Sequence, residues 1–256
     1  MKTLVVAQQK GGVGKTSSVV HLAFDFLERG LRVAVIDLDT QGNASYTLHG
    51  FTSGYLASHM FDKDGAALRQ SFKDLPDGPL VRLIESDAVL ADMEKRSLTD
   101  AARAFKGNIE ALAVCGFDVV LIDTAPALGV TLAAALYGAD CVLSPIELEA
   151  YSIQGIKKMV TTIANVRARN TKLKFLGMVP SKVDARNPRH ARHLAELNAA
   201  YPELMIPTSI GLRSSIADAL ASRVPVWKIK KTAARKASRE VRALAAYVLE
   251  KLEIAQ

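Results

Sequence analysis

The sequence predicts an α/β fold, built on a single doubly wound, mostly parallel sheet with helices on both faces. Three observations support this prediction. Short β-rich runs alternate with longer segments whose apolar residues recur at helical spacing, which is typical of strand–helix–strand units. The short runs are apolar at consecutive positions, as in strands that are buried on both faces. A glycine-rich loop joins the first of these strands to the first helix.

The expected strands are the continuous apolar runs at residues 3–7, 32–36, 119–122, 141–145 and 175–179, with a shorter strand near 81–84. Helical spacing marks residues 16–29, 98–114, 128–137 and 152–169. The stretch 42–78 is richer in Gly, Ser and Asp, and we expect small helices and loops there. Because no repeat or linker interrupts the pattern, we expect one domain over residues 1–256, with a basic helical segment at about 223–252.

The composition is ordinary for a soluble globular protein. The chain has 256 residues, of which 49% are hydrophobic and 23% are charged. No apolar stretch reaches the roughly 18–20 residues that cross a bilayer, and the N-terminal apolar run is too short for a secretory signal. The two cysteines, Cys115 and Cys141, lack metal-ligand spacing and are expected to be core residues. We therefore expect a cytoplasmic protein.

The glycine-rich loop predicts a phosphate site, and it reads Lys10-Gly11-Gly12-Val13-Gly14-Lys15-Thr16-Ser17. Its glycines let backbone N–H groups approach phosphate oxygens, and the helix N-terminus adds partial positive charge. Lys15 would reach the β- and γ-phosphates of ATP, and the Thr16 hydroxyl would bind Mg²⁺. The alternative is a glycine turn that binds no ligand. A dinucleotide loop fits less well, because Ser17 stands where a third glycine is needed.

Carboxylates follow two of the expected strands. Asp123 ends the run 119–122, and Asp37 and Asp39 follow the run 32–36. Since the carboxyl ends of parallel strands face the ligand crevice, Asp123 can hold the magnesium directly or through water. The alternative for Asp123 is a helix cap before Pro126. Asp37 and Asp39 are expected at the same edge of the sheet.

The loop departs from the common phosphate-loop pattern at one end, where Gln9 replaces the first glycine and Lys10 adds a second lysine. This string resembles the deviant Walker A loop of the ParA/MinD/iron-protein superfamily. The resemblance implies that Lys10 reaches the phosphates of the partner subunit, so that the protein forms a homodimer on ATP binding. The residues alone indicate only that a second cation near the triphosphate would stabilise charge.

Two further segments resemble the same family. Asp37-Leu38-Asp39-Thr40-Gln41 is similar to its Asp-x-Asp-Pro-Gln switch, with Thr40 in place of proline, and residues 123–126 are similar to its second switch. The resemblance implies that Asp39 orients or deprotonates the attacking water and that Asp37 supports the metal shell. It also places the adenine near Pro180, Lys182 and Pro207, although either proline could simply belong to a turn.

The excess positive charge lies in the last third of the chain. Residues 186–242 contain 12 Lys or Arg against four acids, and the net charge of the whole chain is +7. If the chain is helical from Lys228 onward, cations three or four residues apart share one face. Such a ridge suits phosphate backbones without reading bases, so non-specific DNA is the expected partner. The candidate DNA-binding residues are Arg213, Lys228, Lys230, Lys231, Arg235, Lys236, Arg239 and Arg242; a merely solvated helix is the alternative.

Taken together, these segments resemble ParA-type ATPases of plasmid or chromosome partition. The resemblance implies slow, Mg²⁺-dependent ATP hydrolysis, an ATP-bound dimer on nucleoid DNA, and stimulation of hydrolysis by a ParB-like centromere-binding protein. Because the loop-bearing strand begins at residue 3, we expect no N-terminal helix-turn-helix domain.

Three other functions were weighed. A MinD-like ATPase that positions cargo or acts on a membrane is the main alternative, but the chain end is acidic and would be repelled by anionic lipid. We therefore expect no membrane partner. An iron-protein reductase would need cysteines in other sequence contexts, and a small-molecule kinase would need an acceptor pocket that these residues do not indicate.

Overall fold

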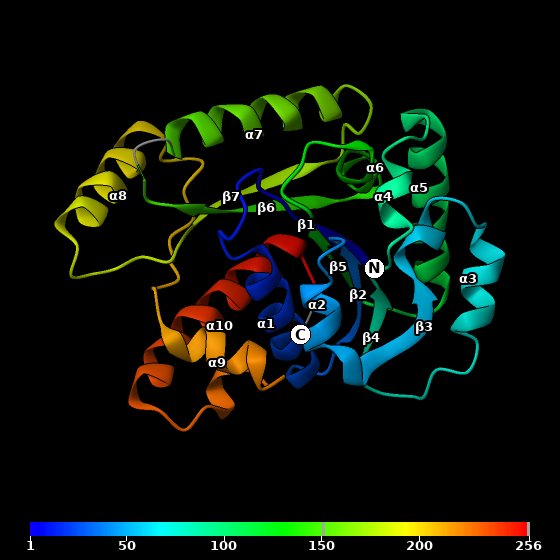
Figure 1. Ribbon diagram of the computed structural model, residues 1–256, viewed down its shortest axis with the longest axis horizontal. Coiled ribbons are helices and arrows are strands. Elements are labelled where there is room, and N and C mark those ends of the chain that lie inside the picture. Colours follow the sequence, from blue (N-terminus) through cyan, green and yellow to red (C-terminus); the bar gives the residue numbers. More distant parts are fainter. Residues whose placement is uncertain (150–151, 255–256) are drawn as a thin grey trace.

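The computed structural model describes residues 1–149 and 152–254. All seven strands that it contains in these residues lie in one parallel sheet, in the order β3-β4-β2-β5-β1-β6-β7. The strands are β1 (Lys2–Val6), β2 (Arg32–Leu38), β3 (Thr52–Leu56), β4 (Leu80–Glu85), β5 (Val119–Thr124), β6 (Cys141–Glu147) and β7 (Lys174–Ser181). The prediction of a doubly wound α/β sheet is confirmed (Figure 1).

Helices cover both faces of the sheet (Figure 1). The α-helices are α1 (Lys15–Glu28), α2 (Asn43–Thr47), α3 (Gly65–Ser71), α4 (Leu90–Met93), α5 (Leu98–Val114), α6 (Val130–Gly138), α7 (Ser152–Arg167), α8 (Pro188–Ala200), α9 (Ser214–Ala221) and α10 (Thr232–Leu252). Short 3₁₀ helices are η1 (His49–Phe51), η2 (Ala57–Met60) and η3 (Val226–Lys228). One core lies beneath α3 to α7, and the other lies beneath α1, α9 and α10.

Strand β3 was not expected from the sequence, which predicted small helices and loops across residues 42–78. It is an edge strand that pairs with β4 through an irregular register. In the run Thr-Ser-Gly-Tyr-Leu only Tyr55 is fully buried. Edge strands of this kind lack a continuous apolar run, so the pattern that identifies buried strands does not detect them.

The basic C-terminal segment is not one helix from Lys228, so the condition under which its cations would share one helical face is not met. The chain forms η3, continues in extended conformation through Ile229 and Lys231, and enters α10 only at Thr232. The break has a physical cause. Trp227 donates a hydrogen bond from its Nε1 to Glu28 at 2.7 Å, and Ile229 packs against the second core. These contacts fix side chains that a continuous helix would turn elsewhere.

The register of the central strands brings their polar ends together. On adjacent strands Asp37 pairs with Asp123, and Val6 at the end of β1 pairs with Asp123 from the other side. The loop that leaves β1 therefore lies directly beside two carboxylates. None of the described helices has both the length and the apolar character needed to cross a membrane.

Candidate functional site

The loop between β1 and α1 has the backbone geometry that the sequence predicted. Gly12 and Gly14 have φ values of +74° and +98°, a region that side chains disfavour. A Cβ on Gly14 would also lie 2.8 Å from the Ser181 Oγ. The start of the loop is held by Gln8, whose Nε2 donates to the Ser144 Oγ at 3.2 Å. At Gly12 and Gly14, where the loop leads into α1, the backbone therefore carries no side chain.

Lys15 is the first residue of α1, and only 6% of it is exposed. Its Nζ donates to the Lys10 carbonyl oxygen at 3.4 Å, back across the loop. Burial lowers the pKa of Lys15, while the carboxylates of Asp123 and Asp39 act in the opposite direction. A buried ammonium beside a glycine-rich loop at the start of a helix is well placed to receive an anion.

Asp123 is fully buried at the end of β5. Its Oδ1 accepts a hydrogen bond from the Thr124 N–H at 3.1 Å, whereas its Oδ2 has no hydrogen-bond partner in the described part of the chain. The pKa of Asp123 is raised to about 8, with burial as the largest cause and the Asp37 carboxylate as the next, while the Thr16 hydroxyl and Lys15 act to lower it. A buried carboxylate oxygen without a partner is costly unless a cation or a donor arrives.

These residues fit a magnesium ion that is completed by phosphate and water. The orphaned Asp123 oxygen and the Thr16 hydroxyl supply oxygen ligands of the type that Mg²⁺ prefers. Within residues 1–149 and 152–254, no group of three or more His, Cys, Asp or Glu side chains could hold a metal by itself. That is expected for Mg²⁺, which keeps several waters and is shared with phosphates.

Asp37 is also fully buried, but its oxygens are already engaged. Its Oδ2 accepts hydrogen bonds from both the backbone N–H and the hydroxyl of Ser45 at 2.8 Å, and its Oδ1 accepts from the Asp39 N–H at 3.1 Å. Burial raises the pKa of Asp37, and these donors act against it. Asp37 therefore fixes the loop that carries Asp39, and it sits next to Asp123 rather than opening onto solvent.

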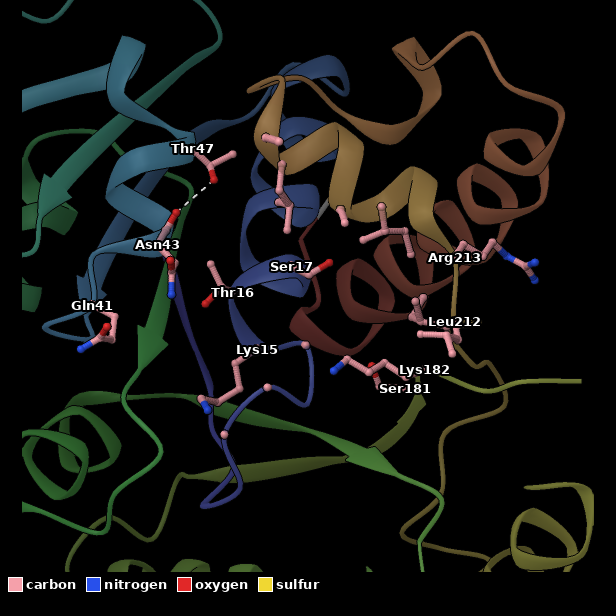
Figure 2. A pocket seen from close by; sticks show the side chains of 18 of the residues that line it. Lys15, Thr16, Ser17, Gln41, Asn43, Thr47, Ser181, Lys182, Leu212 and Arg213 are labelled. Atoms are coloured by element: carbon pink, nitrogen blue, oxygen red, sulfur yellow. Dashed lines mark hydrogen bonds between the residues drawn. The ribbon is translucent and has the colours of Figure 1, made fainter. Parts of the chain in front are cut away.

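A cavity of about 610 Å³ opens beside the loop, a volume in the usual range for small-molecule sites. Its floor is formed by the glycines of the loop with Thr16 and Ser17 of α1. Asn43 and Thr47 of α2 lie on one side, and Leu212 and Arg213 lie on the other, next to α9 (Figure 2). Asp39, Gln41, Ser181 and Lys182 also line it. We call this space the main cavity.

Of the three residues expected around the adenine, only Lys182 lines the main cavity. Pro180 and Pro207 instead line a separate hollow of about 440 Å³ together with residues of α8. The reason is the alternation of side chains along β7, which turns Pro180 away from the loop and Ser181 toward it. The two prolines therefore lie outside the lining of the main cavity, and a contact between them and the adenine stays a prediction.

Lys10 does not enter the main cavity of its own chain. Its Nζ lies 2.6 Å from carboxylate oxygens of both Glu147 and Glu149, and 47% of the side chain is exposed. Although burial lowers the pKa of Lys10, the hydrogen bonds that it donates to Glu147 and Glu149 raise it overall. Glu147 also lies 3.1 Å from the Nζ of Lys182, on the rim of the main cavity. Lys15 thus lines the main cavity, whereas Lys10 does not.

Two of the cations expected to bind DNA are instead internal. Arg213 forms a two-point contact with Glu240 of α10, with an Nη2–Oε1 distance of 2.7 Å. Arg242 joins α10 to α1 by ion pairs with Glu28 and with the fully buried Asp25, at 2.6 Å for Asp25. The Arg242 guanidinium also lies 3.8 Å from the ring centroid of Trp227. Charge spacing alone did not reveal these partners, which are distant in sequence.

The remaining expected cations keep a surface position. Lys231 is exposed but pairs with Asp218 at 2.6 Å. The side chains of five others are exposed, and we call them the outer cations: Lys228, Lys230, Arg235, Lys236 and Arg239.

Replacement of Arg242 by alanine is expected to lower the free energy of unfolding by about 1–3 kcal/mol. The buried Asp25 then loses one of its two cations, and Trp227 loses the guanidinium stacked on it. Urea denaturation followed by circular dichroism measures the change. Arg239→Ala is the matched control, because the exposed Arg239 should cost no more than about 0.5 kcal/mol. Equal losses in the two variants would contradict an internal role for Arg242.

Sequence reasoning missed the apolar wall of the main cavity. Ile216 and Leu220 of α9 line it, about 200 residues after the loop, and Tyr46 of α2 lines it as well. Apolar residues at helical spacing look like core residues, so nothing in the pattern indicated that α9 faces a cavity. Glu147 and Glu149 were also missed, because carboxylates beside a lysine far away in the chain leave no local signal.

The sequence of the whole chain is similar to that of known proteins. The sequence profile described as an AAA domain matches residues 1–175. Protein IncC of Escherichia coli is 72% identical, over 100% of this chain and 71% of its own length. The chromosome-partitioning ATPase Soj of Thermus thermophilus is 32% identical, over 86% of this chain and 84% of its own.

Among solved structures, cobyrinic acid a,c-diamide synthase of Mycobacterium smegmatis, with a bound ATP analogue and magnesium, is similar at a TM-score of 0.74 and 26% identity. The similarity covers 98% of this chain and 94% of that protein. The match to IncC extends over the whole chain and so includes the phosphate loop, both carboxylate segments and α10. The chain therefore belongs to the ParA-type partition ATPases, the family that includes these relatives.

Proposed function

We propose that the main cavity binds ATP with Mg²⁺ and that the protein acts as an ATP-switched, DNA-binding partition ATPase. The observation that carries this proposal is the combination of a buried Lys15, an orphaned and buried oxygen of Asp123, and a loop whose glycines leave its backbone without side chains. A polyphosphate would satisfy the ammonium, and a cation would satisfy the carboxylate. The magnesium and ATP analogue bound in the similar synthase structure support the same kind of occupant here.

Within this proposal each residue of the site has a role. Backbone N–H groups of the loop and Lys15 bind the β- and γ-phosphates. Thr16 and Asp123 hold Mg²⁺, which neutralises charge on the transferring phosphate. Asp39 lies in the main cavity, where its carboxylate can orient the attacking water. Asp37, fixed by Ser45, supports the position of Asp39 and the shell around the metal.

We further propose that ATP joins two copies of the chain. Lys10 is turned out of its own cavity and is half exposed, so it can reach a phosphate held by a second subunit if that phosphate replaces its ion pairs with Glu147 and Glu149. Dimerisation brings two sets of outer cations onto one body, and binding of the second set becomes effectively intramolecular. DNA retention then depends on the nucleotide state. The name of the chromosome-partitioning ATPase Soj supports a chromosome or a similar DNA molecule as cargo. We propose a ParB-like protein as the stimulator of hydrolysis on the resemblance of the loop and switch segments alone.

Location on the nucleoid follows from non-specific DNA binding and belongs to the same proposal. A MinD-like membrane role is the second candidate that the sequence raised. It is disfavoured by the end of α10, where Val248, Leu249 and Leu252 are buried against the core and so are not available as an apolar membrane anchor.

A DNA mobility-shift assay with ATP, with ADP and without nucleotide tests the proposal. We expect retention with ATP only, and about eight phosphate contacts per dimer should give a log–log salt slope of roughly −7. Flotation with anionic liposomes, run with the same three nucleotide states, tests the membrane alternative. Equal DNA binding in all three states, or a salt slope near zero, would refute the switch. ATP-dependent flotation without a DNA shift would favour the MinD-like role.

A further inference from the structure

An arginine and a tyrosine meet at the rim of the main cavity. The Arg223 guanidinium carbon lies 4.3 Å from the centroid of the Tyr46 ring, which is the geometry of a cation–π contact. Tyr46 belongs to α2 and lines the cavity, and 58% of it is exposed. Arg223 follows the C-terminal end of α9. No part of the site described above uses this contact.

The contact joins two opposite walls of the cavity. On one side α2 contributes Asn43, Tyr46 and Thr47, and on the other side α9 contributes Ile216 and Leu220. Thr16 and Ser17 at the start of α1 lie between these walls, as Figure 2 shows. The contact between Tyr46 and Arg223 therefore ties the α2 wall of the cavity to the segment that follows the α9 wall.

The backbone at Arg223 adds a second, independent observation. Arg223 has a φ of +56°, in the left-handed region. The Val224 N–H donates to the Ala219 carbonyl oxygen at 3.0 Å, a pattern that ends helices and in which glycine is usual at this position. A side chain there strains the backbone. Arginine at such a position is best explained if its side chain forms a contact that offsets the strain.

The Tyr46 ring is the contact that the structure records for this side chain. Across residues 1–149 and 152–254, Arg223 forms no ion pair within 4.0 Å with a carboxylate. Holding Tyr46 also holds α2, which begins immediately after the loop that carries Asp39 and Gln41. The pair is thus placed to restrain both the opening of the cavity and the loop that faces the phosphates.

We propose that Arg223 and Tyr46 form a strap across the mouth of the main cavity, and that the strap slows the release of bound nucleotide. This inference rests on the proposed binding of nucleotide in the main cavity. Separation of α2 from the end of α9 must break the cation–π contact. Removal of the contact should therefore speed release, whatever its effect on hydrolysis.

The release rate of radiolabelled ADP, chased with excess unlabelled ADP and followed by rapid filtration, measures this effect without a dye near the strap. For Tyr46→Ala we expect release to be about 2- to 5-fold faster, which corresponds to the ~0.5–1 kcal/mol of an exposed cation–π pair. Tyr46→Phe keeps an aromatic face and should release ADP at the parent rate. Arg223→Gly should release ADP as fast as Tyr46→Ala.

The Arg223→Gly variant also distinguishes loss of the strap from a general loss of stability. Glycine relieves the left-handed backbone, so the melting temperature of Arg223→Gly should not fall, while release still accelerates. Arg103→Ala, an exposed arginine of α5 on the other side of the sheet, is the control with an unchanged rate. Parent-like release from Arg223→Gly would overturn the strap even if Tyr46→Ala releases ADP faster, because Tyr46 also lines the cavity. Tyr46→Phe behaving like Tyr46→Ala would overturn it as well. Failure of the parent protein to bind ADP at all would instead refute the proposed function.

Discussion

Lys15→Ala is expected to reduce ATP hydrolysis by at least roughly 100-fold and to abolish ATP-dependent DNA retention. Lys15 is buried within the loop, and burial lowers the pKa of its ammonium, so the charge is costly without an anion beside it. Removal of this group leaves the developing negative charge on the phosphates without its closest cation. Phosphate release measured at saturating ATP and Mg²⁺ gives the first value, and the mobility shift gives the second.

Lys106→Ala is a suitable control for this variant, because the exposed Lys106 lies on α5 on the other face of the sheet. Circular dichroism should show that both variants are folded. Since alanine removes a poorly solvated charge, Lys15→Ala should not be less stable than the parent protein. Hydrolysis at parent rates by a folded Lys15→Ala protein would be incompatible with the proposed site.

The second large effect is expected from Arg235→Ala, Lys236→Ala and Arg239→Ala combined. These outer cations lie on the first turns of α10 and have exposed side chains. Their loss from both subunits removes about six of roughly eight phosphate contacts, so the log–log salt slope should change from about −7 to about −2. At roughly 0.1 M salt, affinity for random-sequence DNA should fall at least 100-fold. ATP binding should not change, because none of the three lines the main cavity.

A control with the same change in net charge is available on the opposite face. Lys95, Arg103 and Lys106 are exposed on and near α4 and α5, and their replacement by alanine also removes three positive charges. If net charge alone governed DNA binding, both triple variants would lose affinity equally. We expect the control to keep a slope within about one unit of the parent value.

The phosphate loop and the central strands were predictable because their signals are local. Consecutive apolar residues identify strands that are buried on both faces, and a glycine string before Lys15 identifies a loop that needs left-handed backbone. The register between β2 and β5 then follows from parallel pairing, and with it the proximity of Asp37 and Asp123. These features depend on residues near one another in the chain or on one rule of sheet geometry.

The parts that could not be predicted depend on contacts between distant segments. The partners of Arg242 lie on α1, more than 200 positions earlier, and charge spacing cannot reveal that Asp25 there is buried. Likewise, the apolar stripe of α9 resembles an ordinary core face, although Ile216 lines the main cavity. Packing between distant segments decides where such a side chain points in the folded protein. The spacing of apolar residues along the sequence carries no information about that packing.

The internal placement of Arg213 and Arg242 has a consequence for sequence change in this family. The planar guanidinium of Arg213 contacts the Glu240 carboxylate at two points, and that of Arg242 stacks on the indole ring of Trp227. The single ammonium of lysine cannot form either contact. The outer cations at 235, 236 and 239 have no such geometric requirement, since a phosphate backbone can pair with a guanidinium or with an ammonium group. Related proteins should therefore interchange arginine and lysine freely along the outside of α10, while substitutions at Arg242 should be tolerated only alongside a compensating change at Asp25.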